Sequence, residues 1–194
     1  MWEVFKKEIR SFLGSFIAYI VMGVFLAITG LFMWIIKGNN VLDLGVASLQ
    51  VMFNIAPYIL IFLVSAITMR GLSEERRLGT IEILTTRPVS DLSILMGKYL
   101  AAVALIVFTL LPTLFYYYTI QQLADPLQGT DAGATWGSYF GLILLAASYA
   151  SIGLFASSLT DNQIVSLIIS MVLCFFASNS VASYTAKYFP KCTS

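Results

Sequence analysis

Five stretches without a single Asp, Glu, Lys or Arg dominate this sequence, and each is about long enough to cross a lipid bilayer. They cover residues of about 12–36, 50–69, 99–120, 136–158 and 164–184. A membrane-spanning helix needs roughly 20 apolar residues, and a charged residue at its centre costs roughly 2.5–3.5 kcal/mol on the insertion scale. The sequence therefore predicts an all-α polytopic membrane helix bundle of five spans, forming a single transmembrane domain over residues 1–194.

The distribution of Lys and Arg predicts the orientation of these spans. Eight basic residues precede the first span or separate the second from the third: Lys6, Lys7, Arg10, Arg70, Arg76, Arg77, Arg87 and Lys98. The other two loops and the C-terminal tail hold three, which are Lys37, Lys187 and Lys191. By the positive-inside rule the N-terminus and residues 70–98 are cytoplasmic. The formal net charge of +1 gives no overall attraction to nucleic acid.

Residues 1–11 are predicted to form an amphipathic helix that lies in the membrane interface. At helical spacing, the apolar side chains of this region, including Trp2, Phe5 and Ile9, share one face, and the charged ones occupy the other. Membrane lipid is therefore an expected partner of this helix. The alternative is a charged flank that only sets the topology of the first span.

The segment RGLSEERRLGTIEILTTRPVS, which starts at Arg70, carries seven charged residues between two apolar spans. Ser73 is a suitable N-cap, Gly79 can end a helical turn, and Pro88 stops the turn that follows. Short helices with apolar side chains among mixed charges suit a surface that docks onto another protein. A solvated loop whose charges only set the topology is the alternative.

The sequence SEERRLGTIEILTTRPVSDLSILMGKYLAA, residues 73–102, resembles the signature of ABC-2 type transporter permeases. The part from Gly79 to Lys98 is most similar to the gliding-motility-associated permease subunit. The resemblance implies an N-terminal interfacial helix and a cytoplasmic coupling helix within 70–98 that contacts a separate ATP-binding subunit. The residues implied for that contact are Glu75, Arg76, Arg77, Gly79, Thr80, Ile81, Glu82 and Leu84.

The family usually has six spans, whereas five are counted here, which would place the C-terminus outside the cell. Either the sequence is truncated after YTAKYFPKCTS, or the protein completes its bundle with a helix of a partner. Both a truncated sequence and a bundle completed by a partner helix are consistent with the sequence.

The resemblance implies the permease subunit of an ATP-driven exporter in the bacterial inner membrane. Its implied partners are the ATP-binding subunit, a second permease in a homo- or heterodimer, and an accessory protein of gliding motility or envelope export. The sequence has no G-x-x-x-x-G-K-[ST] phosphate-binding loop. We therefore expect no enzyme activity, cofactor or metal on this chain, with ATP bound by the partner. A non-transporting membrane anchor or scaffold is the alternative function.

Polar side chains within the spans are the candidates to line a transport path: Asn54, Tyr58, Thr109, Thr113 and Tyr149. The spans contain no ionisable Asp, Glu, Lys or Arg, and the chain contains no His. This composition disfavours an ion-coupled carrier, because such carriers place titratable groups inside the membrane. It also disfavours a membrane-embedded enzyme, because no general base accompanies the hydroxyl groups.

The last two spans carry small residues that predict close helix packing. In the fifth span they recur at four-residue spacing, at Ser166, Ser170, Cys174 and Ser178. Small residues at this spacing allow helix backbones to approach closely in lipid. The short connection TDNQ between the two spans predicts an antiparallel hairpin.

Overall fold

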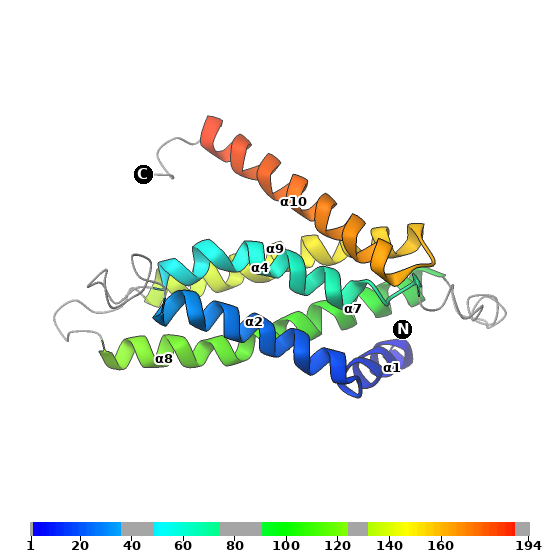
Figure 1. The fold of residues 1–194 in the computed structure, drawn as a ribbon, viewed down its shortest axis with the longest axis horizontal. Coiled ribbons are helices and arrows are strands. Elements are labelled where there is room, and N and C mark those ends of the chain that lie inside the picture. Colours follow the sequence, from blue (N-terminus) through cyan, green and yellow to red (C-terminus); the bar gives the residue numbers. More distant parts are fainter. Residues whose placement is uncertain (1, 36–48, 74–90, 124–131, 189–194) are drawn as a thin grey trace.

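The computed structural model describes residues 2–35, 49–73, 91–123 and 132–188, and every regular element in these ranges is a helix. In chain order they are α1 (Trp2–Leu13), α2 (Phe16–Trp34), α4 (Gln50–Thr68), α7 (Asp91–Leu110), the short 3₁₀ helix η1 (Leu111–Thr113), α8 (Leu114–Leu123), α9 (Ala132–Leu159) and α10 (Gln163–Tyr188). Figure 1 shows α2, α4, α7, α8 and α9 running along one long body. The predicted all-α fold is confirmed.

Within the described ranges, four helical segments are long and apolar enough to cross a membrane: Gln50–Thr68, Leu92–Gln122, Gly133–Leu159 and Gln163–Val181. The second of these combines α7, η1 and α8, and its 3₁₀ turn contains Pro112. Proline lacks the backbone N–H that an α-helical hydrogen bond requires, which explains the local change of helix type. The pair Trp2–Leu13 and Ala18–Trp34, bent by 70°, gives a fifth span when it is counted as one.

The helical break near the N-terminus lies at Gly14 and Ser15. The sequence predicts an interfacial helix over 1–11, whereas α1 continues to Leu13, where its last turn is closed by the hydrogen bond from Gly14 N–H to Arg10 O (2.9 Å). On the exposed side of α1, Trp2 stacks on Phe5 with ring centroids 5.2 Å apart. An amphipathic helix that turns away from its span in this way has the form expected at a membrane surface.

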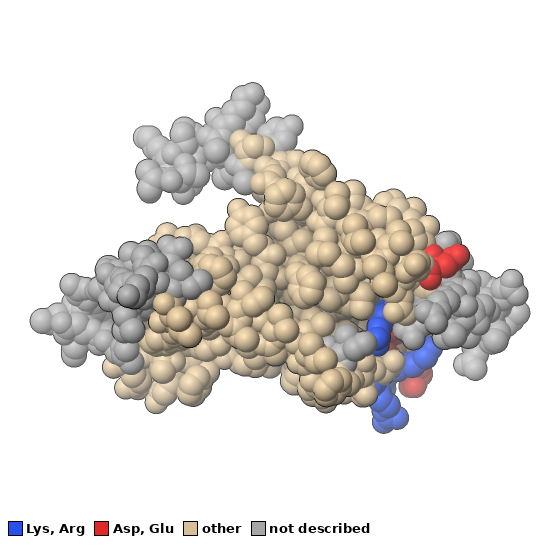
Figure 2. All heavy atoms as spheres, in the orientation of Figure 1, with Lys and Arg blue, Asp and Glu red and all other residues tan. Residues whose placement is uncertain are grey.

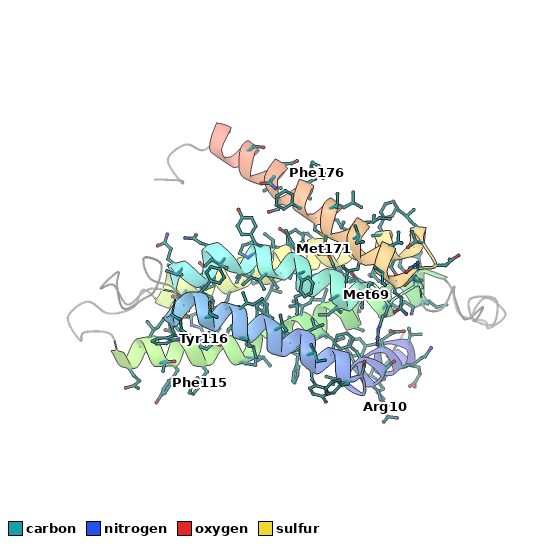
Figure 3. The ribbon with its side chains drawn as sticks, in the orientation of Figure 1. Arg10, Met69, Phe115, Tyr116, Met171 and Phe176 are labelled. Atoms are coloured by element: carbon teal, nitrogen blue, oxygen red, sulfur yellow. The ribbon has the colours of Figure 1, made fainter. Side chains whose placement is uncertain are left out.

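Helix α4 lies at the centre of the bundle and packs against α2, α7, α9 and α10. Leu60, Leu63 and Val64 of this helix are at most 1% exposed. Apolar side chains also cover the outside: Phe115 on α8 and Phe176 on α10 are 67% and 66% exposed (Figure 3). An apolar exterior of this kind is what a lipid-facing bundle requires.

The stripe of small residues on α10 contacts both α4 and α9. Ser170 forms a 2.9 Å hydrogen bond with Ser65 of α4 through their hydroxyl groups. Gly153 of α9 lies so close to α4 that an added Cβ would overlap Thr68 Oγ1 and lie 3.2 Å from Ser170 Oγ. The close packing predicted for the last two spans is present between α9 and α10, and α4 joins them at the same small side chains. Beyond this contact, α10 leans away from the bundle toward its C-terminal end (Figure 1).

Candidate functional site: the charged end of the bundle

The charged side chains gather at the end of the molecule where α1 lies. Figure 2 shows Lys, Arg, Asp and Glu together at this end of the visible face, whereas the described residues at the opposite end show none. The group includes residues of α1, Arg70 after α4 and Lys98 on α7. The positive-inside rule predicts that this end faces the cytoplasm.

Lys98 forms a buried link between three parts of the chain at this end. Its Nζ donates to Glu8 Oε1 of α1 at 2.8 Å and to the carbonyl oxygen of Gly71 at 2.7 Å. The Lys98 side chain is 2% exposed and that of Glu8 is 25% exposed. We call this three-residue arrangement the Lys98 clasp. It joins α1 and the turn that follows α4 to the first half of α7.

The burial of Lys98 explains why the clasp holds together. A buried ammonium group is costly unless it is paired with an opposite charge and hydrogen-bonded. Glu8 supplies the charge, and Gly71 supplies a backbone carbonyl oxygen in the turn that follows α4. Moving α1 away from α7 would therefore leave a charged nitrogen without its carboxylate inside the protein.

A second link fixes the end of α4 to α9. The hydroxyl oxygen of Ser157 accepts hydrogen bonds from the backbone N–H groups of Leu72 (3.0 Å) and Ser73 (3.1 Å). The same hydroxyl lies 3.3 Å from the carbonyl oxygen of Met69, to which it donates. Ser157 is fully buried. The residues directly before the segment 74–90 are thus held against α9, while the Lys98 clasp holds the helix that follows it.

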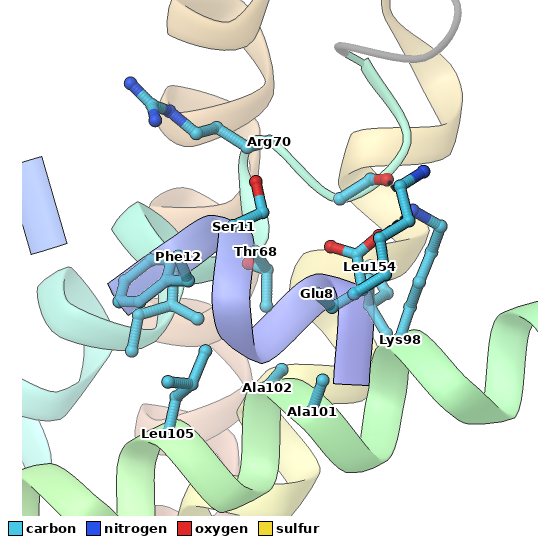
Figure 4. A pocket seen from close by; sticks show the side chains of 13 residues that line it. Glu8, Ser11, Phe12, Thr68, Arg70, Lys98, Ala101, Ala102, Leu105 and Leu154 are labelled. Carbon is cyan, nitrogen blue, oxygen red and sulfur yellow. Dashed lines mark hydrogen bonds and ion pairs between the residues drawn. The ribbon is translucent and has the colours of Figure 1, made fainter. Parts of the chain in front are cut away.

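A cavity of about 290 Å³ lies beside the Lys98 clasp. It is lined by Lys7, Glu8, Ser11, Phe12, Ile67, Thr68, Arg70, Gly71, Lys98, Ala101, Ala102, Leu105 and Leu154. Figure 4 shows Glu8 and Lys98 together on one side, and Phe12 and Leu105 on another. Within the described ranges of the chain, no group of three His, Cys, Asp or Glu residues could hold a metal ion.

The residues predicted to contact an ATP-binding subunit, Glu75 to Leu84, lie outside the described residues. The clasp and Ser157 flank this segment and were not singled out from the sequence. Lys98 has two signals in the sequence: it lies at the start of a span, where a lysine usually sets topology, and it ends the stretch that resembles the permease signature. Neither signal predicts its pairing with Glu8. Nothing in the sequence distinguishes Ser157 from the other serines of its helix.

The five candidate path residues take different positions. Thr109 and Thr113 are buried, and their hydroxyl groups donate to carbonyl oxygens of the same helical stretch, at Leu105 (2.8 Å) and Leu110 (2.6 Å). Tyr149 is 3% exposed. Asn54 and Tyr58 lie on an exposed face of α4. None of the five lines the cavity beside the clasp, and their role in a transport path stays a prediction.

Comparison with known protein families identifies the family of this chain. Among curated proteins and among solved structures, no significant match to the chain was found. The family described as "ABC-2 family transporter protein" matches residues 42–192. This range covers most of the chain, including the charged segment, Gly71, Lys98 and Ser157. The chain therefore belongs to the ABC-2 family of transporter proteins.

Proposed function

We propose that this chain is the permease subunit of an ATP-driven exporter and that residues 70–98 receive force from a separate ATP-binding subunit. Membership of the ABC-2 transporter family supports the transport role. The proposed contact residues are Glu75, Arg76, Arg77, Gly79, Thr80, Ile81, Glu82 and Leu84. The N-terminus and this segment would face the cytoplasm, with the chain in a bacterial inner membrane.

The Lys98 clasp is the structural feature that best supports force transfer through residues 70–98. A segment that transmits force needs rigid attachment to the helices that it moves. The clasp ties the α7 side of the segment to Gly71 and Glu8, and Ser157 holds the α4 side. Displacement of residues 74–90 would therefore act on α1, α4 and α7 together, which is how a local push becomes a rigid-body reorientation of helices.

The sequence supplies no phosphate-binding loop, so ATP would be bound and hydrolysed by the partner. A second permease subunit, identical or related, would complete the transport path. Gliding motility or envelope export is the setting proposed from the similarity of residues 79–98 to that subgroup. Asn54, Tyr58, Thr109, Thr113 and Tyr149 remain the candidate path residues.

Glu82→Arg is expected to separate the chain from its ATP-binding subunit. Reversing a charge at the proposed contact creates repulsion where the partner surface is complementary, and such contacts cost several kcal/mol. The tagged chain is purified from its native membrane in mild detergent, and co-purifying proteins are identified by mass spectrometry. Glu3→Arg is the matched control, because it makes the same reversal on the exposed side of α1.

The proposal expects an ATP-binding protein with the parent and with Glu3→Arg, and at least tenfold less of it with Glu82→Arg. Equal recovery with all three chains would contradict the contact assignment. No ATP-binding protein with any of them, under conditions that retain other partners, would favour the non-transporting anchor or scaffold instead.

A further inference from the structure

The span that begins with α7 changes its helix type toward the end that lies away from Lys98. Helix α7 is followed by the 3₁₀ turn Leu111–Thr113 and then by α8. Pro112 lacks the N–H that an α-helix needs, and the N–H of Leu114 bonds to the carbonyl oxygen of Leu111, three residues before it. A short 3₁₀ stretch inside a helix often marks a hinge, because its hydrogen-bond geometry is poorer. Bending of this span is therefore concentrated at Leu111–Thr113.

The two sides of this turn belong to two separate apolar cores. Leu110, at the end of α7, packs in the main core of the bundle with residues of α4. Ile120 of α8 is 1% exposed and belongs to a second core. The second core consists of Met33, Leu49, Met52, Ile120 and Tyr139. Movement of α8 about the turn would therefore disturb the second core and leave the main core packed.

Two tyrosine hydroxyl groups hold α8 and the turn against the bundle. Tyr139 of α9 donates to the carbonyl oxygen of Thr113 at 3.1 Å and lies 3.2 Å from the hydroxyl group of the same residue. Tyr116 of α8 donates to the carbonyl oxygen of Leu26 in α2 at 3.2 Å, and Figure 3 shows it on the side of α8 that faces α2. Hydrogen bonds between membrane helices are individually modest, so they can break and re-form during a conformational change.

The remaining contacts of this span allow α8 to move when α7 is displaced. Phe115 and Tyr118, on the outward side of α8, are 67% and 57% exposed. Movement of α8 away from α2 and α9 would thus displace lipid rather than another described part of the chain. At the other end of the span, Lys98 ties α7 to α1 and to the turn that follows α4. Because α7 runs without a break from Lys98 to Leu110, displacement of its first half also moves the turn and α8.

We propose that α8 is the outer gate of the transport path and opens about Leu111–Thr113 when the hydrogen bonds of Tyr116 and Tyr139 break. This inference rests on the proposed transport function, in which force enters at the cytoplasmic end and the path then opens at the opposite end. The candidate path residue Thr113 lies within the hinge. Its carbonyl group accepts the Tyr139 hydroxyl group in the closed arrangement and is released when the gate opens.

Hydrogen–deuterium exchange of the full-length chain in lipid nanodiscs tests the hinge and its hydrogen bonds. Tyr139→Phe removes the hydroxyl group and keeps the ring that contacts Phe53, so we expect the amides of α8 to exchange about fivefold faster and those of α7 to be unchanged. Tyr118→Phe makes the same change on the exposed side of α8 and should leave exchange unchanged. Pro112→Ala restores the missing N–H and should slow the exchange of α8. Circular dichroism checks that each variant retains its helices.

Gate opening is measured in the complex with the co-purified ATP-binding subunit, without nucleotide and after trapping with ATP and vanadate. We expect trapping to make α8 exchange about fivefold faster in the parent and to have no such effect in Pro112→Ala. Equal exchange of α8 in both states of a complex that hydrolyses ATP would overturn the gate. Acceleration by Tyr139→Phe that spreads equally through α7 and α9 would also overturn it. Absence of any co-purifying ATP-binding protein would instead contradict the proposed function, and the gate with it.

Discussion

Gly153→Ala is expected to lower the stability of the bundle by about 1–3 kcal/mol, which is the usual cost of extra volume in a packed core. At this position α9 crosses α4 with no room for a methyl group. The added Cβ would overlap Thr68 Oγ1 and lie 2.9 Å from Thr68 Cβ. Thr68 cannot turn away easily, because it is buried and its hydroxyl donates to Val64 O at 2.9 Å. Thermal unfolding in detergent, followed by aggregation or by exposure of Cys174, measures the loss.

Gly141→Ala is the matched control on the same helix. A Cβ at Gly141 meets no atom within 4 Å, so this variant should be as stable as the parent. Adding Thr68→Ala to Gly153→Ala should recover part of the loss, because it removes the nearest overlapping atom, and neighbouring substitutions of this kind are non-additive. Equal stability of Gly153→Ala and Gly141→Ala would show that α4 and α9 are farther apart than described.

Lys98→Met is expected to destabilise the chain by about 3 kcal/mol. Removing one partner of a buried ion pair costs about 3–5 kcal/mol, and the lower end applies because the Glu8 side chain keeps 25% exposure. Methionine preserves most of the packing volume, so the loss reports the hydrogen bonds to Glu8 and Gly71 rather than a cavity. The measurement is chemical unfolding of the reconstituted chain, followed by tryptophan fluorescence.

Two further variants separate the parts of the Lys98 clasp. Glu8→Gln keeps an acceptor for Lys98 Nζ and loses only the charge, so its effect should be smaller than that of Lys98→Met. Lys6→Met removes an exposed lysine from α1 and should be nearly neutral. If Lys98→Met and Lys6→Met had equal stability, Lys98 would not be the buried link between α1 and α7.

The sequence predicts the membrane spans well because hydrocarbon tolerates few exceptions. An uncharged apolar stretch of roughly 20 residues rarely forms anything other than a membrane-spanning helix. The sequence predicts the break between α1 and α2 two residues too early. Phe12 and Leu13 are apolar enough to begin the span, but they belong to α1. Pattern alone does not show where an apolar run turns, and here the turn falls at Gly14.

The contacts at the charged end could not be predicted from the sequence. Glu8 and Lys98 are 90 positions apart, and their pairing depends on α1 folding back onto α7. Ser157 is one of many serines, and only its position beside the end of α4 gives it two N–H donors. The sequence shows that Asn54 and Tyr58 are polar, but it does not predict which side of α4 faces the bundle. Apolar residues occur on every side of that helix, so no single apolar face marks the buried side.

Residues 70–98 are proposed to bind an ATP-binding subunit, and site-specific photo-crosslinking in the native membrane can detect this contact. A benzophenone amino acid replaces Ile81 or Leu84 within the proposed contact, and Phe115, which is exposed on α8 at the opposite end of the bundle, serves as the control position. We expect the first two positions, and not Phe115, to form a covalent adduct with a protein that contains a phosphate-binding loop. Adducts only with proteins that lack such a loop, or the same adduct from Phe115, would contradict it.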